Sequence, residues 1–258
     1  MTAEDLKAKG EKISGGDNEE LRTEEQGERN ALMGAEASRH RRCVAIIVYM
    51  AQDRPDLCVA ACHLARSMSC PTMDDHVKLK RVVRYISSHR RCVNLFQFQA
   101  ETQKVDLLTD SDWANDTRTR KSHSGGAIVI GSHMVAHWSR IQPVVALSSG
   151  EAELYAGVAG LSRFLGVVNM LRDLRGQDWG DLTHKVDAAA CKGILLRRGA
   201  GGVKHLETKF LWVQEAIQAK QIKVEKIPRE LNISDALASF SPGPDLERKL
   251  RLMGCECR

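Results

Sequence analysis

The strings Val-Asp-Leu-Leu-Thr-Asp-Ser-Asp-Trp-Ala (residues 105–114) and Ala-Leu-Ser-Ser-Gly-Glu-Ala-Glu (residues 146–153) bound the stretch that decides the fold. Between them, short apolar runs at residues 127–131 and 134–139 flank a glycine and predict two strands. A helix is predicted from about residue 149 onward. Acidic side chains therefore lie at Asp110, which ends the strand at the start of the stretch, and where the helix begins. Because the ends of strands in an open α/β sheet present side chains to a ligand, this arrangement predicts a site there.

The chain after this stretch predicts alternating helices and strands. Apolar side chains at steps of three or four residues give the helix over residues 149–174 one buried stripe, formed by Leu154, Val158, Leu161, Leu165 and Val168. Further elements follow in the order strand, helix, helix, strand and short helix, at residues 183–187, 188–197, 205–220, 222–227 and 234–239. The sequence thus predicts an α/β fold.

The segment that precedes this stretch predicts helices. Residues 44–51 are apolar, and Pro55 in the next turn stands near a helix start, where its missing N–H costs least. Another helix is predicted around residues 79–86, with apolar side chains on one face and Lys and Arg on the other. Residues 1–38 have few large apolar side chains and no helical period, so we expect them to be disordered.

The charge of the chain is unevenly distributed. The formal net charge is +5, but residues 1–38 hold ten acids against five Lys and Arg, which leaves about +10 on the remainder. That excess favours a polyanionic partner. No run of about 18 apolar residues occurs, so no membrane partner is expected. The N-terminus lacks a signal-peptide pattern, so we expect an intracellular location, cytoplasmic or nuclear and not secreted.

The eight cysteines are spread through segments that otherwise predict helix core, so reduced thiols are expected. A zinc site formed by Cys58, Cys62, His63 and Cys70 is conceivable. No Cys-x-x-Cys pair follows these residues, however, and buried small side chains are the favoured interpretation.

Three groups of residues occur in a fixed order. They are Thr-Asp-Ser-Asp-Trp-Ala (109–114), Arg-Lys-Ser-His-Ser-Gly-Gly (120–126), and Trp-Ser-Arg-Ile-Gln with Ala-Leu-Ser-Ser-Gly-Glu-Ala-Glu (138–142 and 146–153). Together they resemble the ribonuclease H domain at the end of copia-type retrotransposon Pol polyproteins. Residues 50–57 and 79–86 look like the segment that joins reverse transcriptase to ribonuclease H in the same polyproteins. The resemblance implies a truncated copy whose ribonuclease H-like, mixed five-stranded sheet is flanked by helices and preceded by a small helical segment.

This organisation divides the chain into four parts: a disordered acidic tail (1–41), a helical connection segment (42–100), a ribonuclease H-like domain (101–240) and a basic C-terminal tail (241–258). The polymerase itself is not expected. Its motif places two aspartates after an aromatic residue and one further residue at a hairpin tip, whereas Asp74-Asp75 follows Thr72-Met73. We interpret this pair as acids favoured at a helix N-terminus.

The resemblance implies four catalytic and metal-binding acids, namely Asp110, Glu153, Asp187 and Asp235. Hydrolysis of a phosphodiester by in-line attack of water uses two divalent ions, and hard Mg²⁺ prefers oxygen ligands. We therefore expect a two-metal Mg²⁺ site that also accepts Mn²⁺. Asp112 is a rival of Asp110, since both would point to one face if the strand continued. Glu151 and Glu153 lie about 200° apart around a helix, and Glu151 fits a first-turn acid better.

Two of these acids have neighbours that depart from the family pattern. Val186-Asp187-Ala188 stands where the family has Cys-Asp-Asn, and Ser-Asp-Ala-Leu-Ala-Ser (234–239) stands where it has Ala-Asp-Ile-Leu-Thr-Lys. Taken alone, Asp187 reads as a strand-end acid and Asp235 as a helix N-terminal acid. The four acids together, in family order, favour catalysis.

Basic residues predict the nucleic-acid contacts, namely Arg118, Arg120, Lys121 and Lys204. The first three lie in the loop after the first acid, for which a solvated surface is the alternative. Lys204 and His205 match the family's Lys-His-Ile-Asp/Glu string, and His205 is either an auxiliary group for proton transfer or a helix cap.

The implied function is that of a metal-dependent endonuclease that cuts the RNA strand of RNA–DNA hybrids as part of a Pol polyprotein. Its expected partners are the hybrid and an upstream reverse transcriptase domain. The alternative is a catalytically degenerate, nucleic-acid-binding remnant of the same fold. A helical module that only docks to a polymerase is disfavoured, because it leaves the four acids unexplained.

Overall fold

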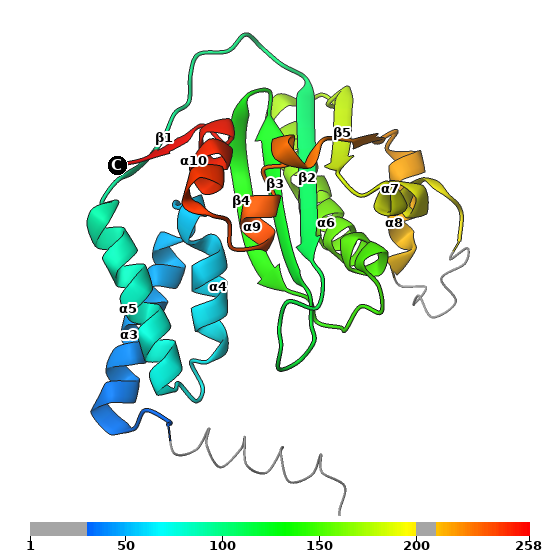
Figure 1. Ribbon diagram of the computed structural model, residues 1–258. Helices are drawn as coiled ribbons and strands as arrows, with labels where there is room; N and C mark the ends of the chain where they lie inside the picture. Colours follow the sequence, from blue (N-terminus) through cyan, green and yellow to red (C-terminus); the bar gives the residue numbers. More distant parts are fainter. Residues whose placement is uncertain (1–29, 200–209) are drawn as a thin grey trace, which may run out of the picture.

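The computed structural model describes residues 30–199 and 210–258 and is built around a five-stranded mixed sheet (Figure 1). β2, β3 and β4 are antiparallel, while β5 runs parallel to β2, and β6 runs parallel to β5. The strands follow one another across the sheet in the order β4 (His133–Ile141), β3 (His123–Ile130), β2 (Lys104–Asp112), β5 (Asp181–Val186) and β6 (Lys223–Lys226). This order and these directions confirm the expected ribonuclease H-like α/β fold class.

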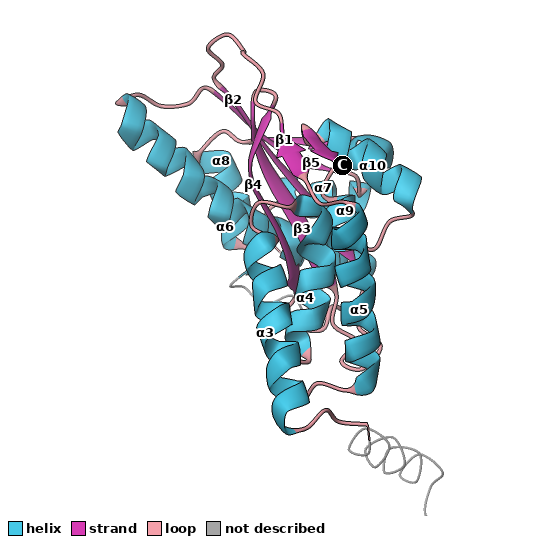
Figure 2. Ribbon diagram, turned by 90° about the vertical axis from the view of Figure 1, so that its left-hand side faces the viewer, coloured by secondary structure: helices cyan, strands magenta, loops and turns pink. Residues whose placement is uncertain are grey.

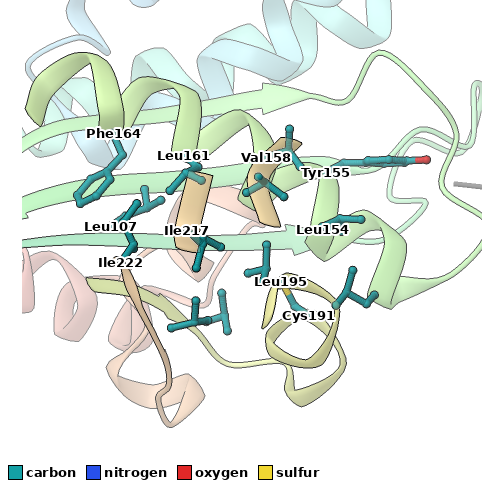
Figure 3. Packing of buried hydrophobic residues seen from close by; sticks show 14 of the residues in the cluster. Leu107, Leu154, Tyr155, Val158, Leu161, Phe164, Cys191, Leu195, Ile217 and Ile222 are labelled. Atoms are coloured by element: carbon teal, nitrogen blue, oxygen red, sulfur yellow. The ribbon is translucent and has the colours of Figure 1, made fainter. Parts of the chain in front are cut away.

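One face of the sheet is covered by three helices: α6 (Ser149–Arg175), α7 (Ala189–Leu196) and α8 (Trp212–Ala219). Figure 3 shows Leu154, Leu161 and Phe164 of α6 in the apolar cluster that also contains Leu107 of β2. The predicted stripe on α6 is buried over its first three positions, whereas Leu165 and Val168 are only partly buried. The expected core of this face is therefore present.

Two glycines allow α6 to approach the sheet closely. A Cβ at Gly160 would lie 2.5 Å from Cγ2 of Thr109, and a Cβ at Gly157 would lie 3.2 Å from Cε1 of His184. Thr109 cannot easily turn away, because its hydroxyl is hydrogen-bonded at 2.8 Å to Nε2 of His184, which is fully buried. The close approach fixes the height of α6 above the central strands, and with it the position of the acid in its second turn.

The opposite face of the sheet is covered by α4 (Cys58–Arg66) and α9 (Asp235–Ala238). Elements from both ends of the chain complete this layer: α3 (Gly34–Met50), η1 (Pro55–Leu57), α5 (Met73–Ser88) and α10 (Gly243–Leu252), with η3 (Arg229–Leu231) against α10. Figure 2 shows α4 and α9 on the side of the sheet away from α6. Leu108 of β2 and Ala127 of β3 join their apolar cluster. The helical connection segment therefore shares one apolar core with the sheet, because the sheet has a second apolar face to bury.

The N-terminal helix begins earlier than the sequence predicts. Residues 34–41, which we assign to the acidic tail, form the first turns of α3, and Ala37 and His40 are buried there. They continue the spacing of Val44 and Ile47 along one face of the helix. The rest of the predicted tail, residues 1–29, lies outside the described residues.

The start of α5 agrees with the interpretation of Asp74 and Asp75 as helix N-terminal acids. Thr72 is the N-cap, and its hydroxyl accepts a hydrogen bond from the backbone N–H of Asp75 at 3.3 Å. The carboxylate of Asp75 accepts the N–H of Thr72 at 3.1 Å in return. This is a capping box, a structural role for the only adjacent pair of aspartates.

The C-terminal tail is folded into the molecule. After α10, the chain forms β7 (Cys255–Cys257), which pairs antiparallel with β1 (Cys92–Asn94). The sequence predicts neither strand, because three residues are too few for a periodic signal.

α6 is long and apolar enough to cross a membrane by length and composition. Half of its apolar window is buried within the fold, against the sheet. This is the pattern of a core helix in a globular domain.

Candidate active site

The register of β2 and β5 brings two of the predicted acids together. Leu108 of β2 lies opposite Lys185 of β5 in the parallel ladder. Asp110 follows Leu108 by two residues, and Asp187 follows Lys185 by two residues. Because the strands are parallel, both acids lie at the same end of neighbouring strands. This neighbourhood agrees with the sequence-based expectation.

Glu153 enters the same place from the second turn of α6. Its Oε1 accepts hydrogen bonds from the backbone N–H of Ser111 at 3.2 Å and from the Ser111 hydroxyl at 3.0 Å. Its Oε2 is buried and has no hydrogen-bond partner within the described residues. A buried carboxylate oxygen left in this state is costly unless something else binds it.

Asp110, Glu153 and Asp187 form one cluster. Each offers a carboxylate oxygen, and these oxygens lie within 4.8 Å of one another. Burial and the nearby charge of Asp187 raise the pKa of Asp110 to about 7. Burial and the charge of Asp110 raise the pKa of Glu153 to about 9. The cluster is therefore electrostatically unfavourable when all three groups are ionised, and a bound cation would relieve that repulsion.

The contribution of Asp110 and Glu153 to the stability of the metal-free protein should fall as the pH rises. The folded state keeps protons on Asp110 and Glu153 that the unfolded chain releases near its ordinary values of 3.8 and 4.5. Their contribution to the free energy of unfolding is thus largest below those values and falls as the pH rises towards about 7 and then about 9. Burial lowers the pKa of His123 and His184 to about 3, so these histidines add stability over part of the same range. The measurement is therefore the difference in melting temperature between the wild-type protein and Asp110→Asn in EDTA, which should change across this range, and Mg²⁺ should reduce that change. An identical pH profile for Asp110→Asn would contradict this origin.

Asp235 lies close to the cluster but is held by two cations. Its charge contributes to the raised pKa of Asp110. Oδ1 accepts hydrogen bonds from Nε and Nη2 of Arg229 at 3.0 and 2.8 Å, and Oδ2 is bonded to Nζ of Lys249. Asp235 and Lys249 are both buried. Both oxygens of the fourth predicted acid are therefore engaged within the protein.

The position of α9, which carries Asp235, depends on a close contact with β3. A Cβ at Gly125 would lie 2.4 Å from the carbonyl oxygen of Ser234, so only glycine admits the helix at this distance. The side chain of Asn232 also donates a hydrogen bond to the carbonyl of Thr109 at 3.3 Å. These contacts tie α9 to the strands that carry and flank Asp110.

Sequence reasoning missed Ser111, Arg229 and Lys249. A usable signal existed for Lys249, since Leu246, Lys249, Leu250 and Met253 follow helical spacing. A lysine on such a stripe predicts a buried cation that needs a carboxylate. The sequence gives no comparable indication for Ser111 or Arg229.

The two rival acids have other partners. Asp112 accepts a hydrogen bond from the side chain of Asn115, and it is not part of the carboxylate cluster. Glu151 accepts the backbone N–H of Leu147 at 2.9 Å and the hydroxyl of Tyr155, in the first turn of α6. The structure therefore places Asp110 and Glu153, rather than these rivals, in the cluster.

The loop between β2 and β3 carries the predicted phosphate contacts Arg118, Arg120 and Lys121. Asp116 fixes the conformation of this loop. Its side chain accepts a hydrogen bond from the backbone N–H of Arg118 at 3.2 Å, and its carbonyl oxygen accepts one from the backbone N–H of Arg120 at 2.7 Å. Arg118 and Arg120 are exposed, and none of the three cations forms an ion pair within the described residues. Lys204 and His205 lie outside the described part of the chain.

No family model matches the chain. It is 28% identical over 207 residues to the retrovirus-related Pol polyprotein from transposon RE2 of Arabidopsis thaliana, covering 77% of this chain and 14% of that polyprotein. It is 38% identical over 112 residues to the secreted RxLR effector protein 161 of Plasmopara viticola, covering 43% of this chain and 78% of that protein. RNase H1 from Halobacterium salinarum aligns with a TM-score of 0.41 and 18% identity, over 52% of this chain and 94% of that structure. The chain thus spans a small part of the polyprotein that it resembles.

Proposed function

Because the chain belongs to the Pol polyproteins of copia-type retrotransposons, we propose that it is a metal-dependent endonuclease that cuts the RNA strand of RNA–DNA hybrids. The observation that carries this proposal is the cluster of Asp110, Glu153 and Asp187 at one end of the sheet. In the polyprotein, the hybrid would come from an upstream reverse transcriptase domain, and the location would be intracellular. The relatives' own polyproteins are far longer than this chain, which supports that context.

The residues present fit a hard divalent cation. All three clustered ligands are carboxylates, the ligand type that Mg²⁺ and Mn²⁺ prefer. The buried Oε2 of Glu153 lacks a partner within the described residues and is a ready acceptor. When bound, divalent ions supply a nucleophile at neutral pH and neutralise charge on the phosphate. Asp110, Glu153 and Asp187 would hold them.

The protein's own part in the reaction is to hold the carboxylates of the cluster in fixed positions. The two hydrogen bonds from Ser111 fix the carboxylate of Glu153 so that its free oxygen is held in one place. Asp110 and Asp187 are fixed by the register of neighbouring strands. Such pre-organisation lowers the cost of gathering like charges at the moment of reaction. Asp235 would add a fourth carboxylate once it is released from Lys249 and Arg229.

A hybrid-cleavage assay with increasing Mg²⁺ tests the proposal. Cleavage of the RNA strand should appear with Mg²⁺ or Mn²⁺ and disappear in EDTA, while single-stranded RNA and double-stranded DNA stay intact. Hybrid binding that survives in EDTA, with no cleavage at any metal concentration, would instead support the non-catalytic remnant.

The basic side chains of the loop between β2 and β3 should make hybrid binding sensitive to salt. A hybrid is held mainly through its phosphates and its 2′-hydroxyls, and each neutralised phosphate releases counterions. Replacing Arg118, Arg120 and Lys121 together with alanine should weaken binding and reduce the slope of log Kd against log salt by about 2 to 3. Replacement of Arg39, Arg42 and Lys80 is the control, because these residues lie on α3 and α5. An unchanged slope in the loop variant would assign the loop to solvated surface.

A further inference from the structure

A second group of side chains that could bind a metal ion lies where the C-terminal strand β7 pairs with β1, next to η1. Asp56 of η1, Cys92 of β1 and Cys257 of β7 each offer one ligand atom, and these three atoms lie within 4.8 Å of one another. Cys58, Cys62, His63 and Cys70, the zinc ligands considered from sequence, do not form such a group among the described residues. The fold therefore gathers thiols that are 165 residues apart, since the group contains residues 92 and 257.

The pairing of β1 and β7 makes the two thiols face each other. Arg91 and Arg258 exchange both backbone hydrogen bonds, at 3.0 and 2.7 Å. The next pair, Cys92 and Cys257, is therefore a non-hydrogen-bonded pair, in which antiparallel side chains come closest. Cys255 lies two residues before Cys257 and so projects from the same face of the ribbon. All three cysteines are free thiols.

The charges around this group suit a bound cation. The side chain of Asp56 is fully buried and is held by Arg54 through bonds of 3.2 and 2.6 Å. Two thiolates, one carboxylate and a divalent ion sum to one negative charge, which the guanidinium of Arg54 balances. Arg54 is itself buried, and it is further fixed by a 2.9 Å hydrogen bond from Nη1 to the carbonyl of His89. A ligating carboxylate that keeps such an outer partner is a common feature of metal sites.

We propose that Cys92, Cys257 and Asp56 bind one Zn²⁺ ion, which joins the C-terminal strand to the connection segment. Thiolate sulfur selects zinc over Mg²⁺, so this site is chemically distinct from the carboxylate cluster. Zinc in proteins is bound tetrahedrally by such donors at about 2.0 to 2.3 Å. The three ligand atoms, which lie within 4.8 Å of one another, would draw together around the ion. The fourth position is open to Cys255 or to water.

Cobalt(II) is the probe that reports the ligands. The full chain, reduced with a phosphine and freed of metal with EDTA, is titrated with Co²⁺. Thiolate-to-cobalt charge-transfer absorption should rise to one equivalent and vanish on addition of Zn²⁺. Cobalt in the carboxylate cluster cannot give this band, because its ligands are oxygen atoms. Cys92→Ser and Cys257→Ser should each weaken uptake more than about tenfold, the loss that even an outer-shell change can cause.

Cys70→Ser, which removes an exposed thiol elsewhere, is the matched control and should leave the band intact. Wild-type protein supplies a second measurement that no folding defect can obscure: Zn²⁺ should protect Cys92 and Cys257 from alkylation, as mapped by mass spectrometry, and should leave Cys70 reactive. Absence of the thiolate band, or equal alkylation with and without Zn²⁺, would overturn the proposal. A Cys92–Cys257 disulfide in the protein before reduction, with no uptake of Co²⁺ after reduction, would overturn it as well.

Discussion

Replacing Asp187 with asparagine is expected to lower hybrid cleavage by orders of magnitude while leaving the melting temperature of the metal-free protein unchanged or slightly higher. The amide keeps the size of the side chain but removes one of the three clustered negative charges that would hold the divalent ions. Without metal, the same charge repels Asp110 and Glu153, as the raised pKa values of both groups indicate. Losing it therefore costs little stability.

Asp112→Asn is the matched control. Asp112 lies two residues beyond Asp110 on β2, but it bonds to Asn115 and is outside the cluster. This variant should keep most of its cleavage activity. Activity and apo melting temperature are best measured on one preparation of each variant. If Asp187→Asn lowers the melting temperature while cleavage stays at the wild-type level, Asp187 is a structural residue and its catalytic assignment is wrong.

The strands could be predicted from local signals, whereas the neighbourhood of Asp110 and Asp187 was expected from the family resemblance. Apolar runs ended by acids give the strands, and the resemblance gives their order. The hydrogen bonds from Ser111 to Glu153 could not be foreseen, since they depend on the height of α6 above β2. That height is set by the contact between Gly160 and Thr109, which no periodicity reveals.

The second face of the sheet was harder to predict for a different reason. Its cover is assembled from both ends of the chain, with Val44 and Leu64 from one end and Leu237 and Leu250 from the other. The helices that carry Val44, Leu64 and Leu237 were expected from local signals, whereas α10, which carries Leu250, was assigned to the C-terminal tail. The joint core depends on contacts between residues far apart in sequence, about which one sequence carries no local signal. The thiols of β1 and β7 were brought together by the same long-range packing.

Lys249 is the residue for which the second large effect is expected. Its side chain is 3% exposed and bonded to Asp235, whose side chain is 5% exposed, so two buried charges depend on each other. Lys249→Met keeps an unbranched apolar stem and removes the ammonium group. Removing one partner of a buried ion pair typically costs about 3 to 5 kcal/mol, and the remaining bonds from Arg229 to Asp235 should place this variant near the lower end.

Arg251→Met on the same helix is the control, because Arg251 is exposed and its ion pair with Glu247 spans 4.0 Å. Exposed pairs contribute about 0 to 1 kcal/mol, so its melting temperature should change little. Equal losses in the two variants would show that the buried pair does not stabilise the fold.

Mg²⁺ should distinguish the structural role of Lys249 from a role at the metal site. In the wild-type protein a cation that approaches Asp235 must compete with Lys249, whereas in Lys249→Met one carboxylate oxygen of Asp235 has lost its ammonium partner. A ligand that binds only the folded state raises the free energy of unfolding by RT ln(1 + L/Kd), where L is the ligand concentration, so tighter binding at one Mg²⁺ concentration gives a larger shift. Mg²⁺ should therefore raise the melting temperature of Lys249→Met more than that of the wild-type protein or of Arg251→Met. Equal shifts in all three proteins would mean that Asp235 is only the structural partner of Lys249 and Arg229 and that the metal site consists of Asp110, Glu153 and Asp187.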